Sequence, residues 1–256
     1  MKEVLKWCAI GDSFTYLNDH LEETDFRVEK GYLTHTEEKL EFPVQIVNLG
    51  INGSGTCDWL EQKLVKADLY TILLGTNDWF SKHIPLGDEL SFQEKKPGSI
   101  LGNLGYIINR IRQLDALAPI VVMNPVERGD FVYIFDRTNN AHGSYEPENG
   151  LWLAEVSKEI YRVVQGEEIY KIDLHGRSGF TPQNAVHFKR LNVNGKMLDV
   201  PYPDYTTLPY DPKQEEYPYP KEAIDMTYDG LHPSDEGNEI LATLLANELN
   251  SIFKNK

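Results

Sequence analysis

Cysteine, basic charge and long apolar runs are all scarce in this sequence. Two cysteines in 256 residues, Cys8 and Cys57, are too few for a disulfide framework, and we expect both to be buried thiols. With 40 acidic against 25 basic residues and a formal net charge of −15, the surface should repel phosphate backbones and anionic membranes. No apolar run approaches the roughly 20 residues that span a bilayer. Nucleic acid is therefore a poor candidate partner, and no membrane span is expected.

The amino terminus enters a strand-like segment within a few residues, which leaves no room for a signal peptide. The chain as written is therefore expected to be cytoplasmic. A chain trimmed of its leader would look the same and would be secreted or periplasmic.

Patterns that gather metals or nucleotides are also missing. Six histidines lack His-x-His or His-Glu-x-x-His spacing and are interpreted as surface or loop residues: His20, His35, His83, His142, His175 and His187. The glycine-rich loop at residues 50–55 lacks the Gly-x-Gly-x-x-Gly order of a dinucleotide site, and there is no P-loop. We therefore predict neither a metal nor an organic cofactor.

The sequence does contain a regular alternation of strand-like and helix-like segments. Buried strands are predicted at residues 5–10, 44–49, 68–74, 120–123 and 168–174. Helices are predicted at residues 32–40, 56–66, 99–117 and 151–165, and after an N-cap at Ser234. This alternation indicates a three-layer α/β/α fold, with a five-stranded parallel sheet in the flavodoxin-like order 2-1-3-4-5.

We expect one domain over residues 1–256, because there is no internal repeat and no linker. Two stretches interrupt the alternation and are predicted to be loop insertions, at about residues 124–150 and 175–226. The second is dense in proline and tyrosine. Irregular segments of that length usually form a functional loop or a small subdomain.

Polar groups follow three of the predicted strands. Ser13 follows the first strand, Gly53 lies in the loop after the second, and Asn77 follows the third. Because the carboxyl ends of parallel strands meet at one edge of the sheet, these groups should lie together. The neighbouring Asp12 and Asp78 are expected to tie their turns together through backbone hydrogen bonds.

A serine needs a base to become a nucleophile. Near the carboxy terminus, only Gly230 and Leu231 separate Asp229 from His232. Asp229 could accept a hydrogen bond from one ring nitrogen, and the other nitrogen would then face Ser13 and take its proton.

Four separated blocks resemble the SGNH hydrolases, also called GDSL esterases. They are Gly11-Asp12-Ser13, residues 50–55, Gly75-Thr76-Asn77-Asp78, and residues 229–232. The resemblance spans the chain in the family's order, and Phe14 stands where the motif's name places leucine. It implies a nucleophile at Ser13, an Asp229–His232 base, and an oxyanion hole formed by the backbone N–H groups of Ser13 and Gly53 and the amide of Asn77. For Gly53, the nearby Gly50 and Gly55 are the alternatives.

The function expected from these features is hydrolysis of carboxylic esters through an acyl-enzyme. Tyrosine and tryptophan near a cleft suit stacking on sugar rings, so deacetylation of a carbohydrate is the first substrate hypothesis, followed by other short-chain esters. Trp79 is a candidate for the rim of the acyl pocket. Two alternatives remain, an acyltransferase that uses the same acyl-enzyme and a carbohydrate-binding protein without turnover.

Overall fold

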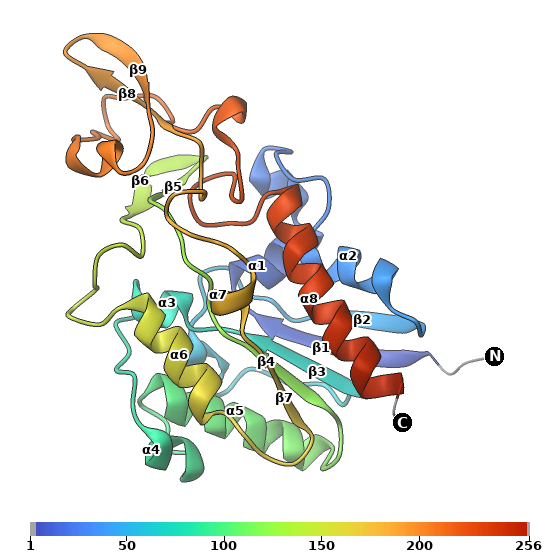
Figure 1. The fold of residues 1–256 in the computed structure, drawn as a ribbon. Coiled ribbons are helices and arrows are strands. Elements are labelled where there is room, and N and C mark those ends of the chain that lie inside the picture. The colour runs from blue at the N-terminus through green and yellow to red at the C-terminus, as the bar shows by residue number, and fades with distance from the viewer. Residues whose placement is uncertain (1–3, 255–256) are drawn as a thin grey trace.

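The computed structural model describes residues 4–254, and its central feature is a five-stranded parallel sheet (Figure 1). The strands lie in the order β2-β1-β3-β4-β7, with the bounds Val44–Asn48, Leu5–Gly11, Leu69–Leu73, Ile120–Met123 and Ile169–Ile172. Since β7 is the fifth strand predicted from the sequence, this is the predicted order 2-1-3-4-5. The three-layer α/β/α fold is confirmed.

Helices cover both faces of the sheet. On one face lie α2 (Tyr32–Lys39) and α8 (Asp235–Lys254), which pack against each other, together with α7 (Leu174–Arg177). On the other lie α5 (Ile100–Leu114) and α6 (Leu153–Val163), with the shorter α4 (Glu89–Gln93) beside α5. Two short helices follow strand ends, α1 (Ser13–Tyr16) after β1 and α3 (Thr76–Trp79) after β3.

The central strands are apolar on both faces because each face is covered. Along β1, Cys8 and Ile10 enter the core under α5 and α6, whereas Trp7 and Ala9 enter the core under α2 and α8. This alternation fixes the register of β1 between β2 and β3, and so fixes where the strand ends. Burial raises the pKa of the Cys8 thiol to about 12. Cys57 is also a free thiol but is only partly buried, contrary to the expectation for it.

Several boundaries differ from the sequence prediction. The helix expected at residues 56–66 is only a 3₁₀ turn, Thr56–Trp59, and α4 lies in a stretch where no helix was predicted. Further 3₁₀ turns occur at Leu17–Asp19, Leu21–Thr24, Asp204–Thr207 and Lys221–Ala223. Ser234 caps α8 as predicted, because its Oγ accepts a hydrogen bond from the N–H of Gly237 at 3.3 Å.

Both predicted insertions contain regular structure that the sequence pattern did not indicate. The first carries the antiparallel pair β5 (Phe131–Tyr133) and β6 (Asp136–Ala141), and the second carries β8 (Lys189–Val193) and β9 (Lys196–Val200). A small apolar cluster joins residues of both insertions, including Val132, Val186 and Tyr219. In Figure 1 the two hairpins lie beyond the carboxyl ends of the sheet strands. Among residues 4–254, no helix has the length and apolar character that crossing a bilayer requires.

Candidate functional site

Ser13 is the first residue of α1, directly after the end of β1. The chain packs so closely there that a Cβ on Gly11 would lie 2.0 Å from the Oγ1 of Thr15. Asp12 caps the short helix by accepting a hydrogen bond from the N–H of Phe14 at 3.1 Å. Ser13 is 5% exposed. Its hydroxyl is therefore held in one place at the carboxyl edge of the sheet.

His232 and Asp229 approach Ser13 from the other end of the chain. The Nε2 of His232 lies 2.8 Å from the Oγ of Ser13, and its Nδ1 lies 2.7 Å from the Oδ2 of Asp229. Because a carboxylate only accepts, Nδ1 carries the proton and Nε2 is free to accept from the serine hydroxyl. The other carboxylate oxygen accepts from the backbone N–H groups of Leu231 at 3.0 Å and His232 at 2.8 Å. This is the arrangement that lets a serine lose its proton as it attacks.

Three aromatic rings hold the imidazole of His232 in place. The rings of Phe14, Phe131 and Tyr228 have centroids 5.9, 5.4 and 5.9 Å from it. Burial raises the pKa of the Tyr228 hydroxyl well above its ordinary value, so the ring beside His232 stays neutral. The three rings restrict the position of the imidazole.

The turn between Asp229 and His232 depends on Gly230. Its φ is +91°, and a Cβ there would lie 1.7 Å from the carbonyl oxygen of Asp130. Its carbonyl accepts from the N–H of Gly129 at 2.9 Å, and its N–H donates to Thr227 Oγ1 at 3.0 Å. The loop after β4 thus packs directly against the loop that carries the candidate base.

Asn77 lies in the first turn of α3, which follows the end of β3. Its Nδ2 donates to the carbonyl oxygen of Ser54 at 3.0 Å. An amide nitrogen has two hydrogens, so this bond fixes the group and leaves the second hydrogen for a ligand. It also joins Asn77 to the loop that carries Gly53.

Among the three glycines of that loop, Gly53 is the one whose N–H is available. The N–H of Gly50 donates to Asn48 Oδ1 and that of Gly55 donates to Asp58 Oδ2, both at 2.8 Å. The N–H of Gly53 has no acceptor within residues 4–254, and its φ of +71° is the left-handed conformation that glycine adopts readily. The assignment of Gly53 to an oxyanion hole remains a prediction, which this geometry favours over the other two glycines.

The two aspartates beside the candidate residues have structural hydrogen bonds, as predicted. Burial raises the pKa of Asp12 to about 7, the N–H of Phe14 and the charge of His232 lower it, and the charge of Asp78 raises it. The buried carboxylate of Asp78 accepts from the N–H of Thr56 at 2.9 Å and from its hydroxyl at 2.5 Å. Burial raises the pKa of Asp78, and its hydrogen bonds to Thr56 oppose that effect. Asp78 therefore ties α3 to the glycine-rich loop.

Trp79, the last residue of α3, lies against Arg128. The Trp79 ring is 1% exposed, belongs to the core under α5 and α6, and donates from Nε1 to the carbonyl of Leu151 at 2.7 Å. The guanidinium of Arg128 lies over it, 5.7 Å from the ring centroid. Contact between Trp79 and an acyl group remains a prediction. Nothing in the sequence singles out Arg128 except its place in the loop after β4.

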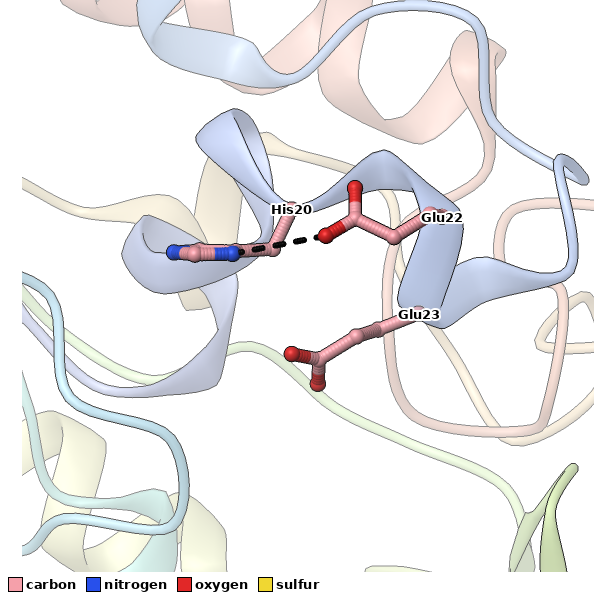
Figure 2. A group of neighbouring side chains, drawn as sticks. All are labelled: His20, Glu22 and Glu23. Carbon is pink, nitrogen blue, oxygen red and sulfur yellow. Dashed lines mark ion pairs between the residues drawn. The ribbon is translucent and has the colours of Figure 1, made fainter.

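The clearest group of potential metal ligands in the described part of the chain is His20, Glu22 and Glu23 (Figure 2). The Nδ1 of His20 lies 3.6 Å from Glu22 Oε1, and one ligand atom from each residue lies within 4.8 Å of the others. His20 also stacks on the ring of Tyr16, and the Tyr16 hydroxyl donates to Glu23 at 2.7 Å. The side chains of His20 and Glu22 are 40% and 63% exposed, as expected of surface groups. These contacts join the three side chains to one another and to Tyr16.

Comparisons with known proteins agree with this architecture. Residues 9–240 match a model of the GDSL-like Lipase/Acylhydrolase family. The crystal structure of a possible lipase from Chitinophaga pinensis is 43% identical, with a TM-score of 0.93 over 97% of this chain and 98% of that one. A carbohydrate esterase family 3 protein from Talaromyces cellulolyticus shares the fold at 14% identity, with a TM-score of 0.52 over 99% of this chain and 100% of that one. A search of the curated proteins found no match.

Proposed function

Because the chain belongs to the GDSL-like Lipase/Acylhydrolase family, we propose that it hydrolyses carboxylic esters through a covalent acyl-enzyme on Ser13. One observation carries the proposal. Ser13 and the Asp229–His232 pair lie at opposite ends of the sequence, yet the fold joins them in one hydrogen-bonded chain at 2.8 and 2.7 Å. Such a chain is what activates a serine that would otherwise be a weak nucleophile.

The proposed reaction proceeds in two halves. In the first, the Oγ of Ser13 attacks the ester carbonyl carbon while its proton passes to Nε2 of His232, and the alcohol then leaves with that proton. In the second, water attacks the acyl-enzyme, gives its proton to the same nitrogen, and releases the carboxylic acid and Ser13. Asp229 stabilises the imidazolium that forms in each half.

The negative oxygen that develops in both halves needs donors that are already in position. We assign the N–H groups of Ser13 and Gly53 and the Nδ2 of Asn77 to this role. Each such donor contributes on the order of 3 kcal/mol, the loss observed when one is deleted from an oxyanion hole. The bond from Asn77 to Ser54 supports the assignment because it holds the amide before substrate binds.

For the substrate we propose a short-chain ester, with an acetyl group on a carbohydrate as the first candidate. A hollow of about 270 Å³ is lined by tyrosines of the two insertions, Tyr145, Tyr205 and Tyr210, and by the Phe131 ring that contacts His232. Aromatic faces beside polar groups suit a sugar ring. The Tyr/Pro-rich insertion would then contribute to substrate binding.

The test of the nucleophile is labelling with a fluorophosphonate. The wild-type protein should be labelled, Ser13→Ala should not, and a matched control at the helix α4 residue Ser91, Ser91→Ala, should be labelled as fast as the wild type. A folded wild-type protein that resists the reagent would refute the nucleophile assignment.

The test of the substrate is a panel of acetylated sugars and of acyl esters of increasing chain length. We expect acetyl esters to give the highest kcat/KM, and activity confined to long chains would contradict the acetyl proposal. Product analysis in the presence of alcohols distinguishes hydrolysis from acyl transfer, because a transferase would yield a new ester in place of the free acid.

A further inference from the structure

Arg128 is a buried cation that forms no direct ion pair with the residues the structure describes. Its side chain is 2% exposed, and its guanidinium lies over the faces of Trp79 at 5.7 Å and Phe80 at 5.3 Å. Within residues 4–254, no carboxylate lies within 4 Å of it, and the nearby Asp130 is already paired with Lys189 at 2.8 Å. Burial lowers the pKa of Arg128 to about 10, which still leaves the group charged at neutral pH. Burying an unpaired charge is costly, so a protein rarely retains one without a use for it.

The hydrogen bonds of this guanidinium are also incomplete. Its Nη2 donates to the carbonyl of His142 at 2.8 Å, and this is its one hydrogen bond to the described residues 4–254. The Nε is buried and has no acceptor among those residues. A guanidinium carries five N–H donors, so most of its capacity is unused. The aromatic faces of Trp79 and Phe80 compensate part of the charge but accept no hydrogen bond in the plane of the group.

Two elements of the candidate site hold Arg128 between them. Trp79 and Phe80, which its guanidinium covers, follow Asn77 in the sequence by two and three residues. On the other side, the N–H of Gly129 donates to the carbonyl of Gly230, within the turn that connects the candidate base to its carboxylate. Arg128 therefore contacts the helix that carries Asn77, and its neighbour Gly129 is bonded to the turn that carries Asp229 and His232.

We propose that Arg128 binds a carboxylate carried by the ester substrate, on either its acyl part or its alcohol part. The proposal rests on the proposed function and narrows its substrate class from esters in general to esters that carry an acid. A planar guanidinium with free in-plane donors matches the two oxygens of a carboxylate. The paired charge would also offset the cost of burying Arg128.

The surrounding charges favour a monoanion over a phosphate monoester. Asp130 and Asp229 both act on Arg128 through their charges. A carboxylate adds one negative charge, which Arg128 neutralises, whereas a phosphate monoester would add nearly two beside the same aspartates. The net charge of −15 would also repel a free dianion more strongly than a monoanion.

The experiment compares charged esters with uncharged esters of the same shape. For the alcohol part, 3-acetoxybenzoate is paired with 3-isopropylphenyl acetate. For the acyl part, mono-4-nitrophenyl succinate is paired with 4-nitrophenyl 4-methylpentanoate. Binding of each intact ester is measured by calorimetry on the Ser13→Ala background, and kcat/KM is measured with Ser13 in place. The pair that responds identifies which part of the substrate carries the acid.

The variants separate charge from geometry. For one of the charged esters, Arg128→Met should weaken binding on the Ser13→Ala background by about 10- to 100-fold, as expected for a hydrogen bond to a charged group. With Ser13 in place, it should lower kcat/KM for that ester by the same factor. It should change the values for the uncharged partner by less than about threefold. Arg128→Lys keeps a cation without the planar donors and should lie between wild type and Arg128→Met. The control Arg162→Met removes an exposed cation from α6 and should leave binding and kcat/KM unchanged for all four esters.

Three results would overturn the proposal. The first is that Ser13→Ala with Arg128 unchanged binds neither charged ester more tightly than its uncharged partner. The second is that Arg128→Met or Arg128→Lys lowers binding and kcat/KM by the same factor for charged and uncharged esters. Arg128 would then act only through the fold. The third is that Arg128→Met and Arg128→Lys both fail to fold and that Ser13→Ala, with Arg128 in place, binds the charged and the uncharged ester of each pair equally. Since calorimetry needs no turnover, an inactive wild type that still prefers the charged ester would refute the catalytic proposal and retain this one.

Discussion

Replacing Asp12 by asparagine should make the stability of the protein less sensitive to pH. Asp12 is 3% exposed, and burial raises its pKa from an ordinary value of 3.8 to about 7. An asparagine has the same shape, does not titrate, and can still accept the hydrogen bond from the N–H of Phe14. The variant therefore removes the titration and keeps the helix cap.

The sign follows from proton binding. Between the two pKa values, the folded state holds a proton on Asp12 that the unfolded state releases, so the free energy of unfolding falls as pH rises. A pKa difference of about 3, at about 1.4 kcal/mol per pH unit, lowers the free energy of unfolding by about 4 kcal/mol from acid to alkaline pH. The stability of Asp12→Asn minus that of wild type should thus increase with pH, by about 3 kcal/mol between about pH 4.5 and about pH 8.

The assay is urea unfolding at several pH values, followed by tryptophan fluorescence. Asp88→Asn is the matched control, because Asp88 also caps a short helix, α4, but is exposed, and its hydrogen bonds to Ser91 lower its pKa. For that variant the stability difference should stay nearly constant from about pH 5 to about pH 8, because Asp88 is ionised there in both the folded and the unfolded state, and should rise only as the pH falls below about 5. If the difference for Asp12→Asn were constant over this range, Asp12 would be ionised in the folded protein and the reasoning would be refuted.

Two further substitutions test the candidate site. Asn77→Ala should lower kcat on an acetyl ester by about 10²- to 10³-fold with little change in KM, because it removes one oxyanion donor; a change confined to KM in steady-state kinetics would contradict this role. Gly230→Ala should cost about 2 kcal/mol or more, since φ is +91° and a Cβ would meet the Asp130 carbonyl at 1.7 Å. Gly53→Ala is its control, because φ is +71° with nothing within 4 Å of the Cβ, and should cost only about 1 kcal/mol. The midpoints of urea unfolding compare the two variants, and an equal loss of stability in Gly230→Ala and Gly53→Ala would argue against the steric explanation.

The strand ends were predictable because their signal is local. Continuous apolar runs identified the buried strands, and a parallel sheet brings their carboxyl ends to one edge whatever the details of packing. Ser13 and Asn77 were therefore predicted as candidate site residues from the strand ends, whereas the Asp229–His232 pair was predicted from its spacing and the family resemblance. The structure places Ser13 within hydrogen-bonding distance of His232. The family resemblance predicted Gly53 in preference to Gly50 and Gly55. The hydrogen bonds of Gly50 to Asn48 and of Gly55 to Asp58 favour that prediction, and sequence spacing does not reveal them.

The insertions were not predictable in the same way. Strand β6 is exposed over residues 136–140, so its sequence lacks the apolar alternation by which a strand is recognised. The expected helix at residues 56–66 is cut to one turn, and the carbonyls of Trp59 and Gln62 accept instead from the guanidinium of Arg110 at 2.8 and 2.6 Å. In both places, contacts with distant residues outweigh local propensity.

Local patterns in the sequence predicted the strands and the polar groups that follow them, because hydrophobic period and strand ends are properties of short segments, and the strand order followed from the flavodoxin-like pattern. The surroundings of those polar groups depend on tertiary packing. It placed Phe14, Phe131 and Tyr228 around the His232 imidazole, and it buried Arg128 against Trp79 without a carboxylate partner in the described chain. These contacts join residues far apart in the chain, so they depend on how the loops pack, which no local pattern encodes.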